Sequence, residues 1–347
     1  MTAPVVEGAP NPAPRERGWR TVVGGLALIL LLPVMPPFSV VVPVTEMALI
    51  LVPVLAACAL AGWRMGGRLF LALMWLAFAI WIIAAGPASS QYGLLVRGWG
   101  VLVAVAFGVT ALVWPERSFL PRALVTIGLA LLVGGAASLA APGGPARVRQ
   151  IVASETLRRA DAFDAEWKAR LTTKDWQDMR ATNAESAKWF EDMLEEQRTM
   201  VRRTAEQSPL FFTGLLALET LAALGLAWAL YHRVGRSRIG PPLANLREFR
   251  FNDQFVWGLI AGLILLVVPG LGALSGFGAN LLLFFGALYV LRGAGVALWF
   301  LAPGRVMTIV LAIVSVLFAG AAGMIYLGLG VGDTWLDWRR RRQRPST

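Results

Sequence analysis

The stretch FFGALYVLRGAGVALWF, residues 284–300, decides the fold class, because it is apolar apart from Arg292 near its middle. A helix needs roughly 20 mostly apolar residues to cross a bilayer, and this apolar segment extends over residues 278–301. A permanent charge at the centre of a bilayer costs roughly 3 kcal/mol or more. The stretch therefore predicts a membrane-spanning helix whose arginine meets an acidic partner inside the protein.

The rest of the chain has the same character. Hydrophobic residues make up 57 % of it and charged residues only 15 %, whereas soluble domains are about 25 % charged. Nine apolar segments stand out, at residues 20–41, 45–62, 69–86, 94–113, 120–141, 209–231, 254–274, 278–301 and 305–328. The sequence thus predicts an all-α polytopic transmembrane bundle of eight or nine spans.

Composition divides the chain into five parts. These are a Pro-rich disordered tail (1–18), an N-terminal transmembrane bundle (19–142), a charged insertion (143–208), a C-terminal transmembrane bundle (209–328) and a basic tail (329–347). The insertion holds as many acidic as basic residues, with apolar residues at helical spacing. Thr172 or Thr173 is placed to cap a second helix within it. We expect the insertion to form an extramembrane helical hairpin.

The net charge of +11 comes from arginines in short loops and tails. Such loops normally lie on the cytoplasmic side of a membrane, so we expect the N-terminus inside and the hairpin outside. Nine complete spans would then place the basic tail outside, against the same rule. One segment is therefore expected not to cross, either the proline-broken first one or the one containing Arg292, where Gly293 and Gly295 favour a break. The expected partners of the arginines are anionic lipid headgroups, not nucleic acid.

Glu219, within the segment 209–231, is the acidic residue expected to pair with Arg292. Both lie near the middle of their segments, at similar expected depths. Asn280, Tyr289 and Thr220 would complete a polar environment around this pair. Two interpretations stay open: a site for a small polar solute or ion, or an ion pair that only fixes helix packing.

Other charged residues are expected at the interfaces. Glu46 lies at the end of its segment, where a charged side chain reaches the headgroups without forming a site. In GDTWLDWRRRR, residues 332–342, Asp333 and Asp337 are four residues apart and alternate with tryptophans and arginines. This pattern is typical of an amphipathic turn at the headgroups.

Several kinds of chemistry are excluded by composition. The chain has one histidine, His232, and one cysteine, Cys58. A histidine-based catalytic triad, a multi-histidine metal site and an internal disulfide each need more than this. We therefore expect no enzyme, no metal and no cofactor.

The C-terminal half resembles a known family. Three stretches carry the resemblance in order: LREFRFNDQFVWGLIAGLILL, NLLLFFGALYVLRGAGVALWF and GDTWLDWRRR, within residues 240–342. They resemble the YybS-like bacterial predicted membrane proteins, a family without an established activity. That family is distantly similar to the substrate-binding membrane subunits of energy-coupling-factor transporters, which work with a separate ATPase. The resemblance implies a multi-pass protein of the bacterial inner membrane, with an energising ATPase module or a homo-oligomer as possible partner.

Two functions follow from these expectations. The first is a protein that binds or transports a small polar solute at a mid-membrane site near Glu219 and Arg292. The second is a membrane scaffold in which the hairpin recruits envelope proteins and the buried charges serve folding.

Overall fold

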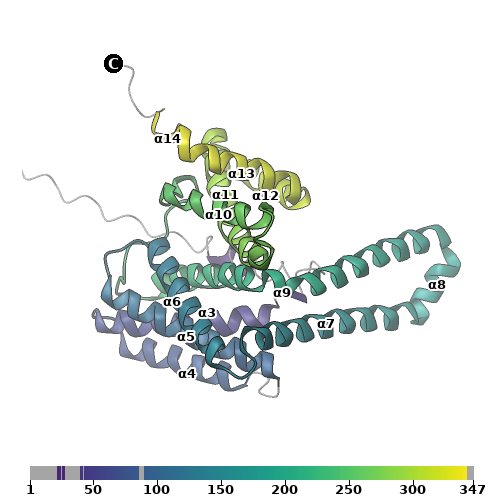
Figure 1. Cartoon of the computed structure of the whole chain (residues 1–347), viewed down its shortest axis with the longest axis horizontal. Helices are drawn as coiled ribbons and strands as arrows, with labels where there is room; N and C mark the ends of the chain where they lie inside the picture. Colours follow the sequence, from purple (N-terminus) through teal and green to yellow (C-terminus); the bar gives the residue numbers. More distant parts are fainter. Residues whose placement is uncertain (1–21, 25, 28–39, 42, 86–89, 342–347) are drawn as a thin grey trace, which may run out of the picture.

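The computed structural model describes residues 22–24, 26–27, 40–41, 43–85 and 90–341. Every regular element in these ranges is helical. The expected disordered tail (1–18), most of the first apolar segment and the last residues of the basic tail lie outside the described ranges. The remaining helices form an N-terminal bundle, a projecting two-helix arm and a C-terminal group (Figure 1).

The N-terminal bundle is built around helix α3. Its helices are α3 (Val44–Arg64), α4 (Leu69–Ala85), α5 (Gln91–Val113) and α6 (Phe119–Ala140). The second half of α9 (Ala184–Val234) packs against α3 and α6, so that the core of this bundle includes Ile50, Phe107 and Trp228. At Gly100, an added Cβ would meet the backbone carbonyl of Leu49. Glycine is thus needed for the close approach of α5 to α3.

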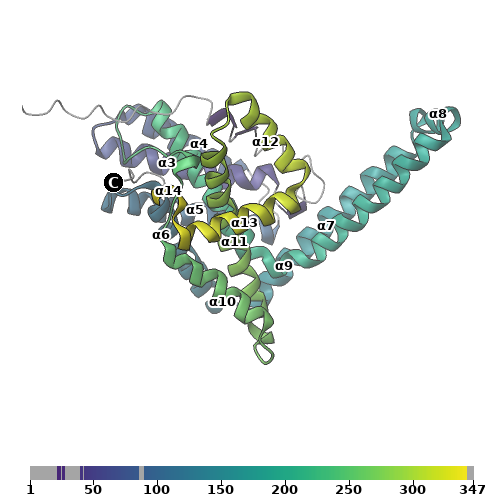
Figure 2. The same ribbon diagram turned by 90° about the horizontal axis from the view of Figure 1, so that it is seen from above.

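The arm consists of α7 (Gly144–Leu171), the short α8 (Lys174–Thr182) and the first half of α9. Figures 1 and 2 show α7 and α9 side by side, projecting from the body with α8 at the tip. Phe190 joins the two long helices to α8, with ring centroids 6.2 Å from Trp167 and 5.3 Å from Trp176. Nearer the body, Val201 and Ala160 lie in a small buried cluster. The position of the arm outside the membrane stays a prediction.

The arm continues into the bundle without a break, although a boundary was expected at residues 208/209. Pro209 lies inside α9, and a proline cannot donate to the carbonyl four residues earlier. The hydroxyls of Thr156, on α7, and Ser208 donate to that carbonyl of Ala205 instead, at 3.2 and 2.9 Å. A polar contact from the neighbouring helix therefore replaces the missing backbone bond and lets α9 run on.

The C-terminal group is organised around α11. It contains α10 (Val256–Val267), α11 (Ser275–Leu301), α12 (Arg305–Leu317), α13 (Ala319–Leu336) and α14 (Trp338–Arg341), with the 3-10 turns η2 (Leu246–Glu248), η3 (Asp253–Phe255) and η4 (Gly272–Leu274). Helix α11 packs against α13, α10 and α9. Gly262 and Gly278 lie where α10 crosses α11. This group covers one side of α9 (Figure 2).

Five described helices are long and apolar enough to span a membrane, or six if a bent pair counts as one span. This differs from the eight or nine expected. Helix α4 and the helix at Asp253–Val267 fall short of the required length, and the expected span 305–328 bends by 112° between α12 and α13. Helix α11 is unbroken through Gly293 and Gly295, so the break expected there was wrong. Those glycines serve close packing instead.

Candidate functional site

Arg292, on α11, binds two acidic side chains. Its Nε donates to Asp333 on α13 at 3.0 Å, and its Nη1 donates to Asp253 in η3 at 2.7 Å. The guanidinium also lies 5.3 Å from the ring centroid of Phe251. The expected pair between Arg292 and Glu219 is not formed, so this prediction was wrong.

The pairing fails because Arg292 and Glu219 lie on helix faces with different neighbours. Arg292 is next to Gly293, and an added Cβ at Gly293 or Gly330 would meet backbone atoms of the opposite helix. This part of α11 therefore lies directly against α13, which supplies Asp333. Tyr289 is fully buried in the same region, with its ring edge-on to Phe251 at 5.0 Å, and is not near Glu219 in any recorded contact.

Asp333 is shared by two arginines. Besides Arg292, it accepts a hydrogen bond of 2.6 Å from Nη2 of Arg339 on α14, and both Asp333 and Arg339 are buried. Arg339 also donates to the carbonyls of Arg247 and Phe249. Asp333 therefore pairs inside the protein, and the expected position of this turn at the headgroups stays a prediction. This carboxylate ties the beginning of the C-terminal tail to α11 and to the loop before α10.

Glu219 is also buried, with 8 % of its surface exposed, and its Oε1 has no hydrogen-bond partner. Its neighbour Thr220 accepts a hydrogen bond of 2.9 Å from the indole of Trp99 on α5 and donates to the carbonyl of Leu216. The charged groups that act on Glu219 are Glu46 and Arg159. The side chain thus lies in the N-terminal bundle, below the root of the arm.

A second ionic cluster lies at that root. Glu46 on α3 accepts hydrogen bonds from the hydroxyl of Tyr92 at 2.9 Å and from Nη2 of Arg159 at 2.5 Å. Arg159, on α7, also donates to Glu155 at 2.9 Å and to the carbonyl of Val40 at 3.1 Å. Glu46 is 7 % exposed and ion-paired inside the protein, so its side chain does not reach out to solvent as expected. The cluster joins the arm to α3 and α5.

The cluster predicts an acid-sensitive arm. Hydrogen bonds from Arg158 above all, together with the charge of Arg159, hold the pKa of Glu155 below its ordinary value. Because the folded-state pKa is depressed, the stabilisation is present above the unfolded-state pKa and is lost as pH falls through the folded value. We expect Glu155→Gln to flatten the acid limb of a plot of melting temperature against pH. The control is Glu166→Gln, which removes an exposed ion pair with Arg170 on the same helix. This variant should leave the acid limb unchanged.

Asn280 joins α11 to the other side of α9. Its Oδ1 accepts from the backbone N–H of Gly214, and its Nδ2 donates to the carbonyls of Leu210 and Gly276, each at 2.6 Å. An added Cβ at Gly214 would lie 3.0 Å from the carbonyl oxygen of Asn280. Of the expected site residues, Glu219 and Thr220 are adjacent on α9 and Arg292 and Tyr289 are together on α11, while Asn280 stands apart from both pairs.

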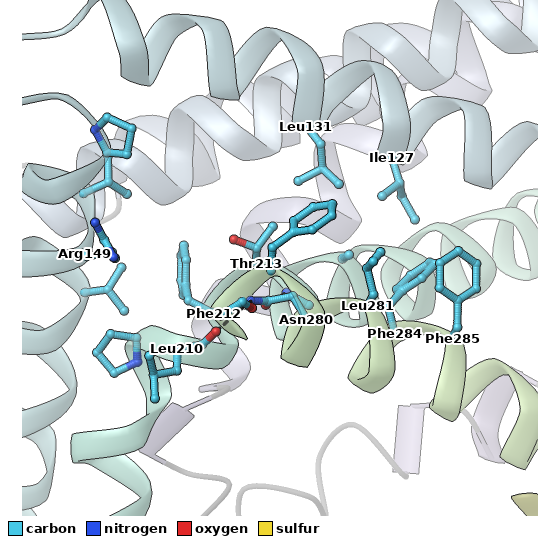
Figure 3. Close-up of a pocket in the computed structure, with 18 of the residues that line it drawn as sticks. Ile127, Leu131, Arg149, Leu210, Phe212, Thr213, Asn280, Leu281, Phe284 and Phe285 are labelled. Atoms are coloured by element: carbon cyan, nitrogen blue, oxygen red, sulfur yellow. Dashed lines mark hydrogen bonds between the residues drawn. The ribbon is translucent and has the colours of Figure 1, made fainter. Parts of the chain in front are cut away.

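Asn280 also lines a cavity in the described part of the chain. This groove has a volume of about 810 Å³ and is bounded by α6, α7, α9 and α11. Figure 3 shows Phe284, Phe285 and Leu281 of α11 facing Ile127 and Leu131 of α6, with Arg149 of α7 at the other end. Volumes of 300–1,000 Å³ are typical of ligand sites.

The charge in the groove is one-sided. Arg149 is its one charged lining residue within the described structure, and the other polar side chains are serine, threonine and asparagine. Arg149 has no recorded hydrogen bond or ion pair with a described residue and is exposed. The lining combines a long apolar surface with a cation at one end, and neutral hydrogen-bonding groups such as Thr213 and Asn280 lie toward the middle (Figure 3).

Residues 174–334 match the model of a family described as "Predicted membrane protein (DUF2232)". The matched region begins in α8 and ends in α13, so it includes α9, the Asn280 contacts and the Arg292–Asp333 pair. No curated protein and no solved structure matches the chain significantly. The match agrees with the membrane character expected for the C-terminal half and supports no likeness to energy-coupling-factor transporters.

No group of three or more His, Cys, Asp or Glu side chains placed to hold a metal occurs among the described residues. The residues that sequence reasoning missed are Asp253, Asp333 and Arg149, the first two as partners of Arg292. Asp253 follows the arginines of LREFR and Asp333 precedes the arginines of the tail, and these positions were a usable signal for the partners. Nothing in the sequence around Arg149 distinguishes it from the other arginines of the arm.

Proposed function

We propose that this protein binds a membrane lipid with an acidic headgroup in the groove between α6, α7, α9 and α11. The observation that carries the proposal is the lining: phenylalanine and leucine side chains along its length, and at one end Arg149, which has no hydrogen bond or ion pair with a described residue. A lipid has the same distribution, with apolar chains and one charged end. An acidic headgroup complements Arg149, because Arg binds phosphate and carboxylate with charge-assisted hydrogen bonds.

The proposal replaces the small polar solute expected near Glu219 and Arg292. That site depended on the two charges meeting, and Arg292 is bound to Asp333 and Asp253 instead. The expected setting is retained: a multi-pass protein of a bacterial inner membrane, with anionic lipid as partner. A lipid enters such a groove sideways from the bilayer, so the proposal requires neither an energising ATPase nor catalysis.

A matched pair of substitutions tests the groove. Leu131 lines it, whereas its neighbour Leu132 is 71 % exposed and is absent from the lining. We expect Leu131→Trp to fill the groove and to lower the amount of lipid that stays bound to the purified protein about tenfold. Leu132→Trp should leave it unchanged. Native mass spectrometry of the full chain released from mild detergent measures the bound lipid directly.

Arg149 tests the headgroup. We expect Arg149→Gln to reduce retention of phosphatidylglycerol about tenfold, since hydrogen bonds to a charged group contribute about 1.5–3 kcal/mol, and to change retention of phosphatidylcholine little. Equal lipid occupancy in the wild type, Leu131→Trp and Leu132→Trp would refute lipid binding in the groove. Equal loss of both lipids in Arg149→Gln would refute the headgroup assignment alone.

One observation favours a second function, a scaffold that uses the arm. Trp189 on α9 is 66 % exposed and Met200 is 51 % exposed, although both lie in the polar part of the helix. Exposed aromatic residues of this kind are enriched in protein interfaces. A photo-crosslinking amino acid in place of Trp189 should capture one defined envelope protein in cells, and Lys188, its neighbour in the sequence, gives the control position. Equal, diffuse crosslinking from both positions would remove this candidate.

A further inference from the structure

The carboxyl group of Glu219 is the buried ionisable group that the groove does not use. It is more than nine-tenths buried, and its Oε1 has no hydrogen-bond partner within the part of the chain that the structure describes. Leu216 and Ala223, about one turn away on either side along α9, belong to the main apolar core, and the adjacent Thr220 binds the indole of Trp99. An isolated carboxylate in such surroundings is far less stable than the neutral acid.

The neighbouring charges do not compensate Glu219. Arg159 is the one cation recorded as acting on it, and the three nitrogens of Arg159 are already used by Glu46, Glu155 and the carbonyl of Val40. Glu46, the other group that acts on Glu219, is an acid and repels a second negative charge. An ionised Glu219 would therefore be both desolvated and next to a carboxylate.

The other helices packed against α9 offer no counter-charge among the described residues. On α5 the titratable residues are Tyr92, which donates to Glu46, and Arg97, whose charge is not among those that act on Glu219. On α11, Arg292 is occupied by Asp333 and Asp253. On α6, Arg122 donates to backbone carbonyls and covers Trp228, and α8 lies at the far tip of the arm (Figure 1).

We propose that Glu219 is a proton-binding site. It takes up one proton from the aqueous side at the root of the arm, becomes a carboxylic acid, and returns that proton to water on deprotonation; no other bond changes. Glu46 and Arg159 mark the way in, since their side chains keep 9 % and 16 % of their surface exposed. The proton removes the repulsion with Glu46 and keeps that carboxylate available to Arg159.

Protonation of Glu219 affects the rest of the structure because α9, which carries Glu219, also lines the groove and forms part of the arm. Two turns toward the arm, Gly214 and Thr213 line the groove, and further out Ser208 contacts Thr156 on α7. Loss of the proton would place an uncompensated charge in α9 and weaken its packing on α3. The proton therefore stabilises the arrangement in which the arm and the groove are as described.

Infrared spectroscopy of the full chain in lipid vesicles tests the proposal, because a protonated carboxyl group has a C=O band separate from that of a carboxylate. We expect a protonated-carboxyl band at neutral pH that is lost in Glu219→Gln. Glu166→Gln is the matched control: it removes an exposed, ion-paired carboxylate of the arm that lies outside this cluster, so the band should remain. Absence of the band in the wild type, or its survival in Glu219→Gln, would overturn the proposal.

A second measurement does not depend on the spectrum. The folded chain holds a proton at neutral pH that an unfolded chain has lost, so this residue makes stability fall as pH rises. The difference in melting temperature between Glu219→Gln and the wild type should grow in favour of the variant from acid to neutral pH. A difference that is constant with pH would contradict proton binding, whatever the outcome of the lipid experiments.

Discussion

Replacing Asp333 by asparagine is expected to lower the free energy of unfolding by about 3 kcal/mol, the largest single effect in the C-terminal group. Asp333 is buried between Arg292 and Arg339, and its side chain is 0 % exposed. Removing one member of a buried ionic network leaves the partner charges in a low-dielectric environment without compensation, and that loss exceeds the value of the contact itself.

Reversible unfolding in mixed micelles measures this change. Asp253→Asn is the control, because it removes the other carboxylate bound to Arg292 but one whose side chain is 61 % exposed. Its expected cost is below about 1 kcal/mol. In the double variant with Arg339→Gln, the cost of Asp333→Asn should shrink, since one of the two arginines that lose their carboxylate is then absent. Equal effects of the two aspartates, or strictly additive costs in the double variant, would show that the network does not act as a unit.

Arg122→Met is expected to have a similar or larger effect, about 4 kcal/mol, in the N-terminal bundle. Arg122 is completely buried and donates to the carbonyls of Ile239, Trp114, Pro115 and Arg117. Methionine fills similar space but leaves these carbonyls without their donor.

The same side chain also lies 4.6 Å from the ring centroid of Trp228 in the core. The control is Arg117→Met, five residues away, whose exposed guanidinium covers Trp114 at 5.2 Å and should contribute less than about 1 kcal/mol. Thermal unfolding followed by circular dichroism compares the two variants. If both lost the same stability, the carbonyl contacts of Arg122 would contribute nothing beyond an interfacial stacking interaction.

Apolar segments were the dependable signal for helices in this chain. The expected segments at 45–62, 94–113, 120–141 and 278–301 correspond to α3, α5, α6 and α11. Helix formation in an apolar segment depends on local composition and needs no distant partner. Whether an apolar segment crosses the membrane depends also on the length of its helix, and α4 has 17 residues and α10 only 12. Apolar segments were therefore a poorer guide to the number of spans than to the presence of helices.

The partner of each buried charge was a different kind of question. Arg292 has an acidic partner, as expected. Its partners are the carboxylates of Asp253 and Asp333, and not that of Glu219. The expected depth of a residue in the membrane does not identify the carboxylate that pairs with Arg292. The pairing depends on which face of α11 meets which helix. Gly293 and Gly330 set that face by allowing backbone contact between α11 and α13.

The amino-acid sequence alone determined that this is a helical chain with several apolar helices, that a charged insertion interrupts them, and that each buried ion needs compensation. These properties follow from the cost of exposing peptide groups and charges to hydrocarbon, which depends on residue type. Only the tertiary structure decided that Asp333 neutralises Arg292, that Glu219 forms no ion pair with a described residue, and that Arg149 ends an apolar groove. Those outcomes depend on helix crossings and rotations, which place side chains distant in sequence within contact and which residue type does not encode locally.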